Sequence, residues 1–195
     1  MGWTDRTTAV TAAERAALAA IRADSEDPWA HHALGCVYLF TRRFDDSLAE
    51  FELALRLNPN FSLTQGYYGL ALSYCGRFEE ADRAARRALR LSPRDPFSVI
   101  FTGIAAYSQF VARNYDEAMR LAREAIRQRV DFVGAHRVLT AAAGMAGDPE
   151  VGAVALQELR RVQPISLAWI TNEMPIMQDA ELERYLEAFR RAGLD

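Results

Sequence analysis

Three glycine residues recur at a fixed interval along this 195-residue chain. Gly35, Gly69 and Gly103 follow one another at a spacing of 34 residues, and Pro59 and Pro93 repeat at the same spacing. A period of this length is typical of a solenoid, in which each helix pair buries its apolar surface only by stacking on its neighbours. The period therefore predicts an all-α chain built as an array of helix pairs.

The period divides the chain into an N-terminal helix, a repeat array and a C-terminal capping segment. Each repeat should contain a first helix, a turn, and a second helix that ends near a proline, because proline cannot continue a helix. In the third repeat the second helix comes three residues late, so we expect a longer first helix or turn between Ser108 and Asn114. The predicted boundaries are 1–27, then 28–166 for the array (28–61, 62–95, 96–132 and 133–166), then 167–195.

The predicted N-terminal helix, Thr11–Ala23, carries alanines where the second helix of the first repeat carries Ser47, Phe51 and Ala54. This pattern favours the second helix of an earlier repeat, whose first helix would lie upstream with Trp3 as its remnant. The alternative is a capping helix, which solenoids need at their ends.

The predicted C-terminal helix, Asp179–Ala192, has a single apolar stripe and a charged opposite face, so we expect it to cover the last repeat. The stripe consists of Leu182, Tyr185, Leu186 and Phe189. Between this helix and the array, residues 167–178 are apolar but contain Pro175, which predicts a short helix followed by an irregular segment.

Charge and composition exclude several functional classes. The formal net charge is −3, and because lysine is absent all 23 basic residues are arginines, many beside acidic residues as on solvated helix faces. Such a chain has no basic field for nucleic acid or for an anionic membrane. The absence of a long apolar run and of a secretory signal predicts no membrane span and a cytoplasmic location. Exclusive use of arginine indicates a GC-rich, bacterial genome.

The motif Leu34-Gly35-x-x-Tyr38, followed by small residues in the second helix and by Pro59, resembles the tetratricopeptide repeat family. The resemblance extends over roughly residues 28–166 and is carried by the repetition. It implies a right-handed superhelix (a TPR solenoid) of about four helix pairs with an extra helix at each end. It also implies a non-catalytic protein-protein interaction module.

A narrower resemblance concerns the C-terminal repeat regions of bacterial class III adenylate/guanylate cyclase-related proteins. It is carried by Asp27–Gly35, Ser92–Phe97 and Tyr185–Leu194. This resemblance implies that the chain is part of a bacterial signalling protein. It carries over no catalytic residue, because the chain contains no cyclase domain.

In the tetratricopeptide family, the first helix of each repeat lines the concave surface. The corresponding positions of the first three repeats form the candidate peptide-binding groove: Trp29, His32, Cys36, Leu39, Phe40, Leu63, Leu70, Tyr74, Phe97, Ile100, Ile104 and Tyr107. They are mostly aromatic or aliphatic, and the Lys, Arg and Asn set with which other members hold acidic chaperone tails is missing. The groove therefore predicts an apolar peptide or an amphipathic helix as partner.

An open apolar groove would be a large exposed patch, which monomers rarely present. This argument favours a groove filled by the chain's own segment Trp169–Met177, or by a second copy in a homodimer. The alternative function is accordingly a structural homo-oligomerisation element with a self-occupied groove.

No pattern in the sequence predicts catalysis, a metal or a cofactor. His32 and Cys36 lie four residues apart and could supply two metal ligands, but no third ligand has a fixed position, so half-buried groove residues are favoured. Gly144–Gly147 lacks the Gly-Lys-Ser/Thr ending of a phosphate loop. We therefore predict no enzyme activity and no cofactor.

Overall fold

The computed structural model describes residues 6–176 and 178–195, and within those ranges the chain is built of α-helices joined by short turns. The helices are α1 (Arg6–Ala23), α2 (Pro28–Phe40), α3 (Phe44–Leu57), α4 (Ser62–Tyr74), α5 (Phe78–Leu91), α6 (Ser98–Val111), α7 (Tyr115–Gln128), α8 (Val133–Ala146), α9 (Pro149–Val162), α10 (Leu167–Glu173) and α11 (Asp179–Arg191). The all-α prediction is confirmed. Within the described residues, none of the helices combines the length and apolar character needed to cross a bilayer.

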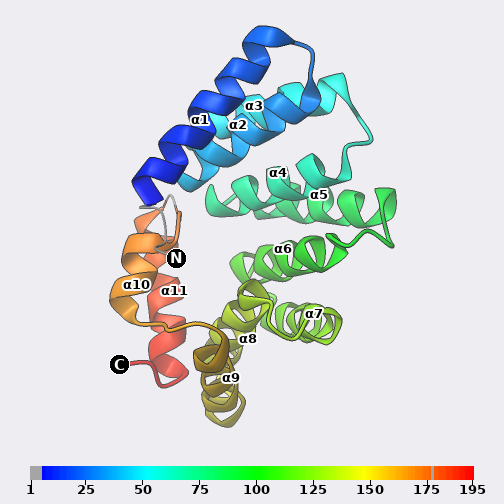
Figure 1. Ribbon diagram of the computed structural model, residues 1–195. Helices are drawn as coiled ribbons and strands as arrows, with labels where there is room; N and C mark the ends of the chain where they lie inside the picture. Colours follow the sequence, from blue (N-terminus) through cyan, green and yellow to red (C-terminus); the bar gives the residue numbers. More distant parts are fainter. Residues whose placement is uncertain (1–5, 177) are drawn as a thin grey trace.

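The four predicted helix pairs are α2/α3, α4/α5, α6/α7 and α8/α9, and they follow one another along an arc (Figure 1). Helices α2, α4, α6 and α8 contact one another in succession, as do the two helices of each pair. Helices α10 and α11 return across the open side of this arc (Figure 1). The chain is thus a solenoid whose inner side faces its own C-terminal segment, defined here as residues 167–195.

Local sequence explains where the helices begin. The carboxylate of Asp27 accepts a hydrogen bond from the backbone N–H of Trp29 at 2.9 Å, and Pro28 occupies the first helical position of α2. Asp148 and Pro149 repeat this arrangement at the start of α9. Helices α3, α5 and α7 each carry two acidic residues in the first turn, where the helix dipole favours negative charge.

Small residues allow the two helices of a pair to approach closely. A Cβ atom at Gly69 would lie 3.0 Å from the backbone oxygen of Ala81 and 3.3 Å from the Cβ of Ala84. The matching alanines of the second helices, such as Ala85 and Ala122, are fully buried. These residues place α5 directly against α4, and overpacking by a larger side chain there would cost about 1–3 kcal/mol.

The third repeat and the N-terminus differ in detail from the expected boundaries. The first helix of repeat three does extend beyond the period, to Val111, but it begins at Ser98 and not at Pro96. Before the helix the backbone forms tighter turns, in which the N–H groups of Ser98 and Ile100 donate to the carbonyls of Asp95 and Phe97, both at 2.8 Å. Helix α1 begins at Arg6, earlier than expected, and Trp3 lies outside the described residues.

Each turn between the two helices of a pair passes through the left-handed region. The residues in this conformation are Arg42, Gly76, Arg113 and Gly147, with φ between 63° and 77°. Glycine adopts this conformation freely, whereas an arginine pays about 1 kcal/mol for it. The turns at the two arginines therefore form despite an unfavourable backbone conformation.

Arg42 uses this position to bind the far end of the chain. Its Nη2 donates hydrogen bonds to the carbonyl oxygens of Thr171, Asn172 and Met174, at 3.3, 3.1 and 2.9 Å. These carbonyls lie at the C-terminal end of α10, where helical backbone lacks internal partners and the dipole favours a cation. The first helix pair is thereby tied to the C-terminal segment.

The C-terminal segment contacts the next pairs in the same manner. The Gln178 side chain donates to the carbonyl of Cys75 at 3.1 Å, and Arg184 donates to the carbonyls of Phe110 and Val111, both at 3.2 Å. These acceptors lie at the C-terminal ends of α4 and α6. The segment thus runs across the C-terminal ends of successive first helices.

Helix α11 completes the fold by packing on α8, as expected for a cap. A Cβ atom at Gly144 would overlap the carbonyl oxygen of Ala188, so the two backbones touch at this point. On the apolar stripe of α11, Tyr185, Leu186 and Phe189 are buried. Of the expected helix and irregular segment at 167–178, the described residues contain α10 followed by non-helical residues 174–176 and 178, and Met177 lies outside the described residues.

We predict opposite effects of glycine at the two left-handed arginines. Arg113→Gly should raise the free energy of unfolding by about 1 kcal/mol, because it relieves the turn and removes no hydrogen-bonded side chain. Arg42→Gly relieves the same strain but removes three bonds to α10, and should lower the free energy of unfolding by about 1 kcal/mol. Urea unfolding of the two variants measures this difference, and equal shifts would contradict the role assigned to Arg42.

Candidate functional site

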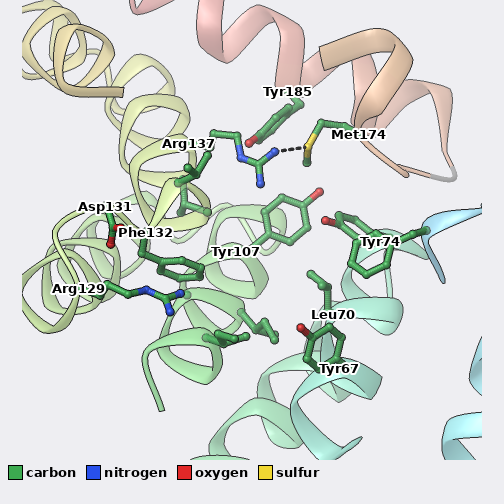
Figure 2. Close-up of a pocket in the computed structure, with 17 residues that line it drawn as sticks. Tyr67, Leu70, Tyr74, Tyr107, Arg129, Asp131, Phe132, Arg137, Met174 and Tyr185 are labelled. Carbon is green, nitrogen blue, oxygen red and sulfur yellow. Dashed lines mark hydrogen bonds between the residues drawn. The ribbon is translucent and has the colours of Figure 1, made fainter. Parts of the chain in front are cut away.

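The concave face contains a pocket with a volume of about 440 Å³ (Figure 2). Its apolar wall comes from α4, α6 and α8, and Phe40 of α2, the C-terminal segment and the turn before α8 form the rest. The residues that line it include Phe40, Tyr67, Leu70, Tyr74, Ile100, Ile104, Tyr107, Arg129, Asp131, Phe132, Arg137, Val138, Met174 and Tyr185. The pocket is therefore a property of at least three helix pairs together.

Tyrosines dominate one side of this pocket. The rings of Tyr74 and Tyr107 pack edge to face with centroids 5.4 Å apart, and Tyr107 packs in the same way on Tyr185 at 6.1 Å. These three side chains are buried to more than nine-tenths. Because Tyr185 belongs to α11, the C-terminal segment supplies part of the wall.

The pocket also contains charge. Arg137 extends from α8 towards Met174, with its Nη1 3.2 Å from the Met174 sulfur (Figure 2). Its guanidinium group also lies 5.4 Å from the centre of the Trp169 ring. Arg129 and Asp131, both exposed, lie at the turn before α8, where Arg129 stacks on Phe132 at 4.8 Å. The site is therefore an aromatic pocket with two cations and one carboxylate.

Burial keeps the tyrosine hydroxyls neutral. It raises the pKa of Tyr67 and Tyr74, and it raises the pKa of Tyr107 well above the ordinary value. Burial also raises the pKa of Tyr185, against a smaller opposing effect of the Arg137 charge. Each of these groups consequently keeps its proton at physiological pH and can donate a hydrogen bond.

The structure brings together six of the residues expected in the groove. Phe40, Leu70, Tyr74, Ile100, Ile104 and Tyr107 all line the pocket. Leu39 does not belong to the surface, since it is fully buried between helices. Phe97 lies in the turn before α6 because that helix starts two residues late, and Trp29, His32, Cys36 and Leu63 lie outside the pocket.

His32 and Cys36 form a separate cluster with internal partners. The hydroxyl oxygen of Thr64 is 3.0 Å from the His32 Nδ1, and the Cys36 sulfur is 3.6 Å from the Nε2. Burial raises the pKa of the Cys36 thiol to about 12, so the thiolate that a metal requires is disfavoured. Among the described residues, no three His, Cys, Asp or Glu side chains converge as metal ligands.

Trp29 occupies a family groove position in the sequence but lies outside the pocket. It is 59% exposed and packs on Phe61 with ring centroids 4.5 Å apart, at the outer end of α2. The exposed aromatic surface of the first repeat is thus distinct from the pocket.

Eight of the fourteen lining residues named above were absent from the expected groove, and Arg137, Tyr185 and Met174 illustrate the two reasons. Arg137 stands at the fifth position of the fourth repeat, which is the register position of His32 and Ile100, so mapping that repeat would have included it. Tyr185 and Met174 come from the C-terminal segment, whose return to the concave face has no periodic signal. Arg137 was missed because the fourth repeat was not mapped, whereas Tyr185 and Met174 were missed because their position depends on contacts between residues far apart in the sequence.

Two segments of the chain match family models described as "Tetratricopeptide repeat", at residues 28–61 and 68–95. The first match coincides with the expected first repeat. Together with the helix-pair architecture, these matches support the tetratricopeptide repeat family for this chain. They do not support the narrower resemblance to cyclase-related proteins.

Sequence relatives cover only part of the chain. The peroxisomal targeting signal receptor of Candida glabrata is 38% identical over 72 residues, which is 37% of this chain and 12% of the receptor. The corresponding receptor of Saccharomyces cerevisiae is 40% identical over 67 residues, 34% of this chain and 11% of the receptor. The matched segment thus spans about a tenth of these receptors.

Solved structures with the same fold cover nearly all of the chain. PilW, described as a widely conserved type IV pilus biogenesis factor, superposes with a TM-score of 0.75 at 16% identity, over 96% of this chain and 83% of PilW. PilF of Pseudomonas aeruginosa gives a TM-score of 0.69 at 13% identity, over 96% of this chain and 81% of PilF. At these identities the likeness establishes the fold, a TPR-like solenoid.

We predict that His32 makes the fold sensitive to acid. Burial lowers its pKa from 6.5 to about 4, so the folded state favours the neutral ring. The stability that the neutral ring supports is complete above pH 6.5 and is lost as the pH falls towards 4, by up to about 3 kcal/mol. Urea unfolding at pH 7 and pH 4.5 should show a larger loss in the wild type than in His32→Gln, and identical losses would refute the assignment.

Proposed function

We propose that this chain is a non-catalytic protein-interaction module that holds a segment of a partner protein in the concave pocket. The observation that carries the proposal is the 440 Å³ pocket, in which aromatic and aliphatic side chains from three helix pairs converge. A volume of this size is typical of binding pockets, and tyrosine-rich walls are typical of protein recognition sites.

The comparisons support the general class of function. Tetratricopeptide repeats occur in protein-binding scaffolds, and the partial yeast relatives are named as receptors for a targeting signal. We extend to this chain only the binding of a protein segment, and no compartment or particular signal.

The wider setting remains part of the proposal. We retain as hypotheses the bacterial origin, the cytoplasmic location and the signalling context that the cyclase-related resemblance implied. The open reading frame that surrounds this chain tests the signalling context directly, since a neighbouring catalytic or DNA-binding domain is what that context requires.

The pocket can be tested with a displayed library of random twelve-residue peptides selected on the whole chain. Peptides from this selection should bind with a measurable dissociation constant. Phe40→Ala and Tyr67→Ala should each weaken binding by about tenfold, because aromatic side chains carry much of the energy of such contacts. Both residues line the pocket and neither is fully buried, so the fold should persist.

Trp29→Ala is the matched control. This residue is an exposed aromatic on the same array but lies outside the pocket, so its replacement should leave peptide binding unchanged. Loss of binding in Trp29→Ala alone would place the contact elsewhere on the array. A stable dimer in light scattering over a concentration series, without peptide binding, would favour the oligomerisation alternative.

A further inference from the structure

The pocket contains more hydrogen-bond donors than the protein itself satisfies. The Tyr74, Tyr107 and Tyr185 side chains are 93–99% buried, since their exposed fractions are 7, 6 and 1%. None of the three hydroxyl groups has a hydrogen-bond partner among the described residues. The buried polar atoms that do lack a partner among the described residues are His136 Nδ1 and Gln163 Oε1, so the three tyrosine hydroxyls retain accessible surface in the pocket and are free to bond to a ligand there.

Figure 2 shows that these hydroxyl groups gather at the same side of the pocket as the Arg137 guanidinium group. The ring contacts between the tyrosines and the electrostatic effect of Arg137 on Tyr74 and Tyr185 confirm that the groups are close. The polar ends therefore form one cluster and not several isolated groups.

Arg137 combines partial burial in the pocket with the absence of a carboxylate partner among the described residues. Arg43, Arg77, Arg120 and Arg184 each form an ion pair with a carboxylate. Arg137 forms no ion pair with a described Asp or Glu, and it contacts the Met174 sulfur and the Trp169 ring. Its charge is thus available to a group that enters the pocket.

We propose that the pocket binds a carboxylate attached to a short apolar group. The carboxylate would accept hydrogen bonds from Arg137 and the tyrosine hydroxyls, and the apolar group would pack against Leu70, Ile100 and Ile104. This inference rests on the proposed function and names the chemistry of its ligand. A guanidinium group and neutral hydroxyls can all donate to carboxylate oxygens, and the positive charge of Arg137 favours an anionic acceptor over a neutral one. The single carboxylate of the pocket, Asp131, is exposed at its edge beside Arg129 and does not cancel the charge of Arg137.

Hexanoate and its neutral analogue hexanamide are suitable probes, because they differ in charge and share the apolar chain. In a titration followed by NMR, hexanoate should bind the wild-type chain at least tenfold more tightly than hexanamide. Arg137→Gln should remove this preference and Arg137→Lys should retain part of it. Equal binding of the two probes to the wild type, or an unchanged preference in Arg137→Gln, would overturn the proposal.

The tyrosines provide a second readout that a purely structural role would not give. Tyr74→Phe and Tyr107→Phe remove only hydroxyls without an internal partner, so thermal unfolding should occur at the same temperature or higher. Hexanoate binding should nevertheless weaken by threefold or more in each variant. A destabilised variant with unchanged hexanoate binding would show that the hydroxyls serve the fold.

Peptides selected from the library separate the two sources of a carboxylate. Amidation of the peptide C-terminus tests the terminal carboxylate, and replacement of Asp and Glu by Asn and Gln tests the side chains. If peptides bind through Phe40 and Tyr67 but neither change matters, the carboxylate inference fails and the proposed function stands. If hexanoate depends on Arg137 but no peptide binds the pocket, the proposed function fails and the carboxylate site stands.

Discussion

The carbonyl groups at the C-terminal ends of helices have no partner within their own helix. In this structure several of them accept hydrogen bonds from side chains that are far away in the sequence. Arg42 binds the end of α10, Gln178 binds the end of α4, and Arg184 binds the end of α6. Arg42 and its acceptors are 129 to 132 residues apart in sequence. These bonds convert an open arc of helix pairs into one whose inner side is closed by its own C-terminal segment.

The pocket is a consequence of that closure. Met174 follows α10 directly and Tyr185 lies one residue after Arg184, so the bonds that position the segment also position two walls of the pocket. Contact between the backbones of α8 and α11 at Gly144 and Ala188 fixes the opposite end of the segment. The C-terminal segment therefore covers part of the concave face and leaves a defined cavity there.

The features that could be predicted from the sequence are those that depend on residues close together in the chain. The glycine and proline period places the helix pairs, and the apolar stripe of α11 identifies a cap, because both depend on residues a few turns apart. Phe97 lies before α6, because tighter backbone turns at Asp95–Ser98 and Phe97–Ile100 precede the helix, which begins at Ser98. Leu39 was misassigned because a family position that faces the groove in one repeat is covered by neighbouring helices in another. The contacts of Arg42 had no sequence signal, since they depend on how far the array curves.

One register position shows how a solenoid can build different chemistry on a repeated backbone. At the fifth position of the four repeats stand His32, Gly66, Ile100 and Arg137. His32 is closed in by Thr64 and Cys36, and the space that a side chain at Gly66 would need is taken by the ring of Phe101. Ile100 and Arg137 both reach the pocket, one as apolar wall and one as cation. Because the backbone is the same at each position, the location of the pocket follows from which side chains fill their own repeat and which extend into the shared space.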